Sequence, residues 1–448
     1  MDIQITSAFI ESIQKRLVAN DLVNLTEELE SIHPADLAEI INQIAEKYKL
    51  PFFNLLKKEV QSDVVAELEG DERENLLDAL SPQEIAEKVL EHMESDDAAD
   101  LIAELSEDKK EKVIKALADE EQAIDIIDLL NYAEDTAGAL MAKELIKVNL
   151  KWTINECIVE LRKQAEQVEN IHTVYAIDDQ DKLIGRITLK HLLVTPPDTL
   201  AESIVDRDIQ MVLASANETE VIQKMEKYDL VVIPVVDELK RLLGRITIDD
   251  VVDVMKEEAE KDYQMASGIS ENVEYSDSVF QLTKARFPWL LIGLIGGIAG
   301  AKVIGVFGVI EETPILAYFM PLIAAMGGNV GVQSSAIVVQ SIANNSLRGS
   351  VLGKLSKELG VGLLNGLLCS IILLLYNLLF ADNLYLSFAV STSLFCVIII
   401  AAIFGTWIPL MLNHFKIDPA LATGPFITTV NDVVGLLLYF SISSLFIS

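Results

Sequence analysis

One carboxylate interrupts the last long apolar run of this chain, and it is the side chain best placed to bind a cation. Asp432 is the only acidic or basic residue within residues 421–448. A carboxylate near the middle of a membrane span costs roughly 2.5–3.5 kcal/mol unless it faces water, a partner or a cation. We therefore expect Asp432 to bind a cation. The alternative is a protonated Asp that is hydrogen-bonded inside a helix bundle.

Small and oxygen-bearing side chains accompany Asp432 in two apolar segments. Gly424, Thr428 and Asp432 recur at helical spacing, so small residues leave room beside the carboxylate. Residues 321–335 carry Asn329 with a glutamine and two serines. Neither segment contains Cys or His, and oxygen ligands suit Mg²⁺, Ca²⁺ or Mn²⁺. Mg²⁺ is usually held through its waters by one or two carboxylates, which fits one Asp from each of two chains. The alternative is that these polar side chains only join helices.

Five apolar stretches are long enough to cross a bilayer as helices. They cover residues 287–309, 315–342, 361–380, 386–412 and 420–446. The basic residues of one set of connections are Lys284, Arg286, Arg348, Lys354, Lys357 and Lys416, whereas the opposite loops carry Glu311, Glu312 and Asp382. The positive-inside rule therefore predicts a multi-pass protein of the plasma membrane, with its N-terminal half in the cytoplasm and its C-terminus outside.

The net charge of −34 belongs entirely to the first 275 residues. Residues 276–448 hold 7 Lys/Arg and 7 Asp/Glu out of totals of 35 and 69. An acidic half attracts cations, and a nucleic-acid partner is disfavoured because it needs a basic surface. The alternative reading of the acidic surface is simple solubility. No signal-peptide pattern opens the chain, which agrees with a cytoplasmic N-terminal half. The three cysteines and five histidines show no zinc-ligand spacing.

The acidic half divides into two kinds of domain. Residues 1–133 are expected to form an all-α superhelical domain, because polar, acidic residues repeatedly open short apolar-periodic segments. Residues 134–200 and 201–262 are expected to form two α+β domains. They repeat a strand, an acidic turn, a second strand and a helix, with Gly-Arg-Ile-Thr units 59 residues apart.

The two α+β copies resemble a tandem pair of cystathionine-β-synthase-type (CBS) regulatory domains. The resemblance implies an adenine-nucleotide site, with ATP as a candidate ligand, at a Gly-x-x-Thr-x-x-Asp pattern. Gly244, Thr247 and Asp250 match that pattern, whereas His191 replaces the acid in the first copy. A strand–turn–helix unit without a ligand is the alternative.

A connecting helix is expected at residues 248–275, leading into a membrane domain at residues 276–448. Asp250, Asp253 and Glu257 follow one another at helical spacing, and like charges at this spacing destabilise a helix slightly. The stripe is either a solvated face or a contact that depends on cations.

Two membrane motifs carry a resemblance that covers nearly the whole chain. Residues 321–333 read Pro-x₄-Met-Gly-Gly-Asn-x-Gly-x-Gln, and residues 424–435 read Gly-Pro-Phe-x-Thr-Thr-x-Asn-Asp-x-x-Gly. Together with the order of domains, these motifs resemble the MgtE-type magnesium channels. The resemblance implies a homodimer in the lipid bilayer with a central pore, where Asp432 binds hydrated Mg²⁺.

The same resemblance implies that cytosolic Mg²⁺ binds acidic interfaces and closes the gate, with the connecting helix as a plug. The acids that match the family are Asp96, Asp100, Asp229, Asp250, Asp253, Glu257, Glu258 and Asp262. Asn217 and Thr219 stand where the family commonly has acids, so some regulatory sites are expected to differ here.

The sequence therefore predicts a Mg²⁺ channel with a bundle of five membrane helices, gated by Mg²⁺ on its cytosolic side. Two alternatives remain at this stage. One is an ion-coupled secondary transporter for Mg²⁺, Mn²⁺ or Co²⁺, and the other is a membrane-anchored sensor of Mg²⁺ or nucleotide that conducts nothing. No catalytic motif points to an enzyme.

Overall fold

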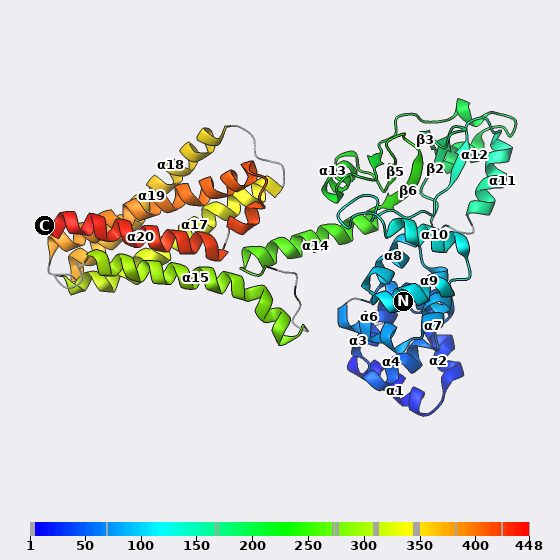
Figure 1. Cartoon of the computed structure of the whole chain (residues 1–448), viewed down its shortest axis with the longest axis horizontal. Coiled ribbons are helices and arrows are strands. Elements are labelled where there is room, and N and C mark those ends of the chain that lie inside the picture. Colours follow the sequence, from blue (N-terminus) through cyan, green and yellow to red (C-terminus); the bar gives the residue numbers. More distant parts are fainter. Residues whose placement is uncertain are drawn as a thin grey trace. The chain divides into compact units, whose positions relative to one another are not determined.

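The structure is a computed structural model of the chain (Figure 1). It describes residues 5–447 except 69, 166–167, 169, 271–272, 274–276, 308–312, 344–349, 381–382 and 423. The chain forms two compact units, which meet between Met255 and Lys256. Arg348 and the loop acids Glu311, Glu312 and Asp382, which entered the topology argument, lie outside the described residues.

The first unit begins with a domain built from short helices, as expected. Its helices are α1 (Ser7–Val18), α2 (Leu22–Leu29), α3 (Pro34–Gln43), α4 (Glu46–Phe53), α5 (Lys58–Ala66), α6 (Gly70–Ala79), α7 (Pro82–Lys88), η1 (Leu90–His92), α8 (Ser95–Glu104), α9 (Glu107–Ala116) and α10 (Glu120–Leu129). Ser81 and Glu84 form a capping box at the start of α7, and Pro occupies the first position of α3 and α7. These start signals explain why the helices are short and frequent.

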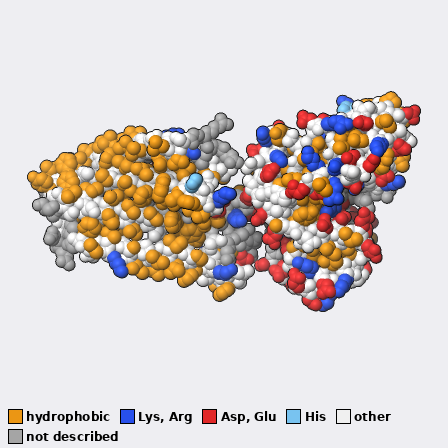
Figure 2. All heavy atoms as spheres, turned by 45° about the horizontal axis from the view of Figure 1, so that its top comes forward, with side chains coloured by type: hydrophobic (Ala, Val, Ile, Leu, Met, Phe, Trp, Pro, Cys, Tyr) orange, Lys and Arg blue, Asp and Glu red, His pale blue; other side chains and the backbone are white. Residues whose placement is uncertain are grey.

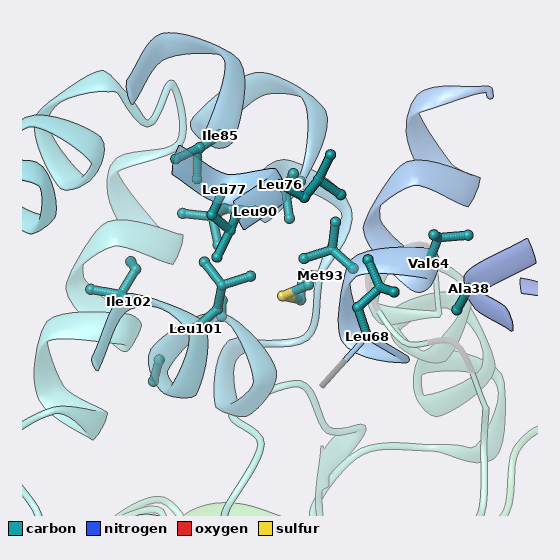
Figure 3. Close-up of a cluster of buried hydrophobic side chains, with 14 of the residues drawn as sticks. Ala38, Val64, Leu68, Leu76, Leu77, Ile85, Leu90, Met93, Leu101 and Ile102 are labelled. Atoms are coloured by element: carbon teal, nitrogen blue, oxygen red, sulfur yellow. The ribbon is translucent and has the colours of Figure 1, made fainter. Parts of the chain in front are cut away.

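Apolar side chains from successive short helices meet in one core (Figure 3). Leu77 of α6, Ile85 of α7, Leu90 of η1 and Leu101 of α8 are all buried there. Because no helix of this length is stable alone, this shared burial must hold the domain together. The core continues into the following sheet domain through Met141 and Val235.

Two three-stranded sheets follow, with the same topology. The elements are β1 (Lys147–Asn149), α11 (Ile154–Gln164), β2 (Val174–Ile177), β3 (Leu183–Ile187), α12 (Leu189–Val194), η2 (Ala201–Ser203), β4 (Val212–Leu213), α13 (Glu218–Tyr228), β5 (Val232–Val236) and β6 (Leu242–Thr247). In each sheet the middle strand runs parallel to the first strand and antiparallel to the third. The duplication expected from the sequence is therefore confirmed in the fold.

The connecting helix α14 (Ile248–Ala266) is shorter than expected, since the prediction extended to residue 275. The helix stops because Gly268 adopts a φ of +81°. The amide of Ile269 then donates to the carbonyl of Gln264, and the amide of Gly268 donates to that of Met265. This is the glycine-terminated hydrogen-bond pattern of a Schellman C-cap.

The second unit contains five helices that are long and apolar enough to cross a membrane, as predicted. Its elements are α15 (Val279–Phe307), η3 (Pro314–Phe319), α17 (Met320–Ala343), α18 (Val351–Phe380), α19 (Leu384–His414), η4 (Pro419–Ala422) and α20 (Gly424–Ile447). α19 is the most buried and packs against α17, α18 and α20, whereas α15 packs mainly on α20. Hydrophobic side chains cover most of the visible face of these helices, whereas charged side chains are dense on the first unit (Figure 2).

Candidate functional site

Asp432 lies where α17 and α20 pack together. A Cβ atom on Gly328 of α17 would stand 3.0 Å from Cγ2 of Thr428 and 3.7 Å from Oδ1 of Asp432. The Thr428 hydroxyl donates to the carbonyl of Gly424 at 2.9 Å and so stays on its own helix. The absence of a side chain at Gly328 thus lets the α17 backbone approach the carboxylate closely, and Asp432 stays half-buried.

The polar residues of α17 divide between two faces. Asn329 and Gln333 are exposed one turn apart, and Ala325 and Gln340 continue the exposed stripe. Carboxamides on a membrane helix do not face lipid without cost, so this stripe is suited to water or to another chain. The structure therefore brings Thr428, Asp432 and Gly328 into one region, whereas Asn329 lies on the exposed stripe of α17.

Asn431, which the sequence analysis did not single out, is a further polar residue of this region. Its side chain is 2% exposed, and neither its Nδ2 nor its Oδ1 has a hydrogen-bond partner within the described part of the chain. A Cβ on Gly331 would overlap Nδ2 at 1.8 Å, so Asn431 packs directly on the glycine face of α17. Its place next to Asp432 in the motif was the available clue.

Gly424, a predicted metal-site residue, lies away from Asp432. It lies eight residues before Asp432, which is about 12 Å along a helix. Gly424 has a φ of +51°, and a Cβ there would stand 2.3 Å from the carbonyl oxygen of Ala266, at the end of α14. Gly268 packs in turn on Pro425. The start of the candidate pore helix therefore rests on the end of the connecting helix.

We expect Gly424→Ala to disturb this junction. The left-handed conformation costs an L-residue about 1–2 kcal/mol, and the clash with Ala266 adds to that. The control is Gly305→Ala, because no atom lies within 4 Å of a Cβ there. Closure by Mg²⁺, measured in liposomes, should be impaired only in Gly424→Ala. Equal closure in the two variants would show that this junction plays no part in gating.

A second group of acids gathers in the first unit, at the start of α8. Asp96 is 8% exposed and accepts a hydrogen bond from the amide of Asp97 at 3.0 Å. Arg245 of β6 is 5% exposed and donates from Nη2 to both carboxylate oxygens of Glu94, at 2.7 and 2.9 Å. Asp250 of α14 faces the same group. The N-terminal domain and the second sheet domain therefore meet through four carboxylates and one guanidinium.

The ionisation of these acids shows that the interface carries more negative charge than it can neutralise. Burial raises the pKa of Glu94 to about 7 even though Arg245 opposes the shift. Burial, with Asp250 and Asp249 nearby, raises the pKa of Asp97 to about 6. Burial and the charge of Asp250 raise the pKa of Asp96 well above its usual range. A divalent cation at this interface would relieve the same repulsion.

The other acids predicted as metal ligands lie around or beyond this interface. Asp253 is exposed and contributes to the raised pKa of Asp97, whereas Asp100 is exposed one turn further along α8. Glu257 and Glu258 follow on α14, exposed and half-buried respectively. Within the described ranges, no three His, Cys, Asp or Glu side chains form a ready-made metal centre.

The second unit holds a pair of acids of which sequence reasoning identified only one. Burial, and then the charge of Asp418, raises the pKa of Asp262 near the end of α14. Asp418 lies in the turn before η4, and its Oδ1 accepts a hydrogen bond from the amide of Ala420 at 2.8 Å. A lone acid just before the motif of residues 424–435 was the clue in the sequence.

Two predicted positions have a clear structural role. Asp229 ends α13 at a φ of +50°, where its amide and that of Leu230 close a C-cap. Asn217 begins α13 by accepting from the amide of Thr219, and its Nδ2 donates to the carbonyl of Asp135. An acid would cap the helix equally well, so the donation from Nδ2 to Asp135 is the local reason for an amide at position 217.

The residues of the nucleotide pattern do not surround an open pocket. Both the amide and the hydroxyl of Thr247 donate to Asp250, at 3.0 and 2.7 Å, so these two residues cap α14. A Cβ on Gly244 would stand 2.5 Å from the carbonyl of Ala142. A hollow of only about 10 Å³, room for roughly one water, lies nearby instead, lined by residues that include His172, Tyr175 and Arg245. It is smaller than the 300 Å³ or more typical of small-molecule sites.

Comparisons with known proteins agree with this architecture. The family model described as a divalent cation transporter, MgtE, matches residues 320–442; the MgtE intracellular N domain matches residues 32–135, and the CBS domain matches residues 137–196 and 201–257. The chain is 31% identical to "Magnesium transporter MgtE" of Bacillus subtilis (strain 168), over 94% of this chain and 93% of the relative. It is 32% identical to the protein of that name from Thermus thermophilus, over 97% of both chains.

Two solved structures resemble the first part of the chain. The soluble part of a magnesium transporter shares 29% identity, with 56% of this chain and 98% of that chain covered and a TM-score of 0.51. The cytosolic domain of the Mg²⁺ channel MgtE in complex with ATP shares 32% identity, with 55% and 99% covered and a TM-score of 0.52.

Proposed function

Because the chain belongs to the MgtE family of divalent cation transporters, we propose that it is a Mg²⁺ channel of the plasma membrane that Mg²⁺ on its cytosolic side closes. Two chains line one central pore, and the N-terminal half lies in the cytoplasm with the C-terminus outside. This proposal rests first on one observation: the half-buried Asp432 carboxylate lies against the bare backbone of Gly328.

The geometry around Asp432 supports binding of a hydrated rather than a stripped ion. The chain supplies one carboxylate there, and its neighbours Thr428 and Gly328 offer no further charge. Mg²⁺ gives up its waters reluctantly and is commonly held through them by one or two carboxylates. Two Asp432 side chains from a homodimer would supply two carboxylates, and Asn329 would accept or donate to the retained waters.

The acids of the first unit support the gating part of the proposal. Their raised pKa values mean that bringing Glu94, Asp96, Asp97 and Asp250 together is costly without a cation. A Mg²⁺ ion that bridges them stabilises the assembled state and shifts the population toward it. Asp229, Asp253, Glu257, Glu258 and the Asp262–Asp418 pair are the further candidate ligands. Their contacts with the partner chain would complete sites that one chain leaves open.

A nucleotide is a second ligand of this proposal, because a cytosolic domain 32% identical to this chain is known in complex with ATP. The candidate place is the hollow at Tyr175 and Arg245, where the Arg245 guanidinium would have to exchange Glu94 for a phosphate. The hollow has to widen to accept ATP. Isothermal titration of the intact protein with ATP tests this, and loss of binding in Tyr175→Ala would locate the site.

Mg²⁺ flux into liposomes, with the proton gradient and the voltage set independently, tests the proposed activity. A channel passes Mg²⁺ down its electrochemical gradient when no proton or sodium gradient exists. Flux that requires such a gradient would instead support an ion-coupled transporter. No flux under any condition would support the sensor, and Asp432 would then be a structural residue.

The raised pKa values predict that pH and Mg²⁺ act on the same interface. A carboxyl whose pKa is about 7 in the folded protein and 4.5 when unfolded stabilises the fold at low pH, and this contribution is lost as the pH rises toward 7. In a metal chelator, the intact protein should therefore gain on the order of 1–3 kcal/mol of stability between about pH 8 and about pH 5. Thermal unfolding followed by tryptophan fluorescence measures this.

Mg²⁺ should flatten this pH dependence, because it offsets the repulsion only where the acids are ionised. Arg245→Gln should steepen it, since an unopposed Glu94 gains a still higher pKa. A melting temperature that is unaffected by pH in the chelator would contradict the reading of this interface.

A further inference from the structure

Glu358 is a second carboxylate within the helices that cross the membrane. α15, α17, α18, α19 and α20 contain two acidic residues between them, Asp432 and Glu358. The sequence analysis placed Glu358 before its third span, but α18 begins at Val351 and includes it. Ionisable residues on membrane helices usually face the interior of the bundle and take part in function.

The structure gives Glu358 a specific partner on α17, the helix whose Gly328 lies against Asp432. The hydroxyl of Ser334, on α17, donates to Oε1 of Glu358, and Ser334 is 4% exposed. Lys354 lies one turn before Glu358 on α18, yet the described structure has no ion pair between them. The contact with Ser334 is thus a hydrogen bond from a buried hydroxyl to a half-buried carboxylate, and hydrogen bonds to carboxylates are among the stronger ones.

This hydrogen bond lies next to a tight contact between α17 and α19. A Cβ on Gly405 of α19 would stand 2.5 Å from the carbonyl oxygen of Gly331 and 2.9 Å from Cβ of Ser334. Ser334 is six residues from Gly328, or about 9 Å along the helix. A displacement of α17 at Ser334 therefore moves the backbone that faces Asp432.

We propose that Glu358 is a positioning residue for ion conduction, which holds α17 in place through Ser334 so that Gly328 stands opposite Asp432. The inference rests on the proposed channel function. Glu358 acts as a hydrogen-bond acceptor behind α17 and does not itself bind the conducted ion. Its removal should change how well the site distinguishes Mg²⁺ from a larger divalent cation, because the spacing across the site changes.

Four variants of the full-length protein in liposomes test this proposal. Glu358→Leu and Ser334→Ala should each reduce Mg²⁺ flux roughly tenfold, since a hydrogen bond to a charged group contributes at least that factor. Both should also lower the ratio of Mg²⁺ to Ca²⁺ flux. The double variant should be no worse than either single one. Glu358→Gln should stay within about twofold of the parent, because its amide oxygen still accepts from Ser334.

The control is Ser370→Ala, which removes a buried hydroxyl of α18 that has no hydrogen-bond partner among the described residues. Unchanged flux in Glu358→Leu, additive losses in the double variant, or lower flux with an unchanged Mg²⁺ to Ca²⁺ ratio would each overturn the proposal. So would a Glu358→Gln variant as impaired as Glu358→Leu, because the charge itself would then be needed. If the parent protein conducts nothing, the proposed function is wrong instead. Thermal stabilities of the same variants would still measure the coupling between Glu358 and Ser334.

Discussion

Asp432→Asn is expected to abolish Mg²⁺ flux while the protein still folds and assembles. A unit charge about 4 Å from a divalent ion attracts it by roughly 8 kcal/mol at an effective dielectric constant near 20. Each 1.4 kcal/mol of this attraction that is lost lowers ion occupancy about tenfold. The substitution keeps the size of the side chain, so the packing on Gly328 survives. Mg²⁺ flux into liposomes, together with size-exclusion chromatography of the purified variant, measures both parts.

Asp277→Asn is the matched control for this result, since it makes the same chemical change just before α15 and outside the candidate site. It should conduct like the parent protein. Full conduction by Asp432→Asn would remove the carboxylate from the ion pathway. A variant that no longer elutes as the parent oligomer would instead give Asp432 a structural role.

Joint substitution of Asp97 and Asp253 by Asn is expected to raise the Mg²⁺ concentration needed for closure. Asp253 and Asp250 both raise the pKa of Asp97, so the three carboxylates repel one another and would together attract a cation. Neutralising two of them also relieves repulsion, which by itself favours closure. We expect the loss of attraction for Mg²⁺ to outweigh that relief, because a divalent ion acts on each carboxylate with twice the charge of a neighbouring carboxylate. We expect roughly a tenfold increase, since a coupling of 1–3 kcal/mol is typical of such linkage.

The measurement is flux as a function of Mg²⁺ on the side of the soluble domains. Asp108→Asn serves as control, because Asp108 is exposed on α9 and pairs with Lys112 one turn away. An unchanged midpoint in the double variant, with normal closure, would show that these acids form a solvated face. The variants leave Asp250 intact, because its carboxylate caps α14 and its loss would weaken the helix itself.

The architecture could be predicted because periodic patterns in the sequence indicate its helices and strands. Long apolar runs defined the five membrane helices, and the repeated Gly-Arg-Ile-Thr units defined the two sheets. The predicted end of α14, residue 275, was too late, because the helix ends at Ala266. Its end depends on the positive φ of Gly268. One glycine in a polar stretch gives little warning of a helix stop.

The site was predictable in its residue types rather than in its geometry. Asp432 and Thr428 follow from spacing on one helix, whereas the contact with Gly328 depends on how α17 crosses α20. Gly424 shares the helical spacing, yet its conformation places it against Ala266. Asp96 is buried and Asp100 is exposed because of how the domains pack. The match of both residues to family acids does not reveal this difference. Asn431 and Glu358 were missed because their roles depend on partners distant in sequence.

We propose that each chain contributes both a half of the pore and a sensor that closes it. The most direct test is Mg²⁺ flux through oriented protein in liposomes while Mg²⁺ on the side of the soluble half is raised and the driving force is kept constant. We expect flux to fall cooperatively as this Mg²⁺ increases. When the acids of the first unit are neutralised, flux should persist at high Mg²⁺. Flux independent of Mg²⁺ on that side, in a protein that conducts through Asp432, would contradict it.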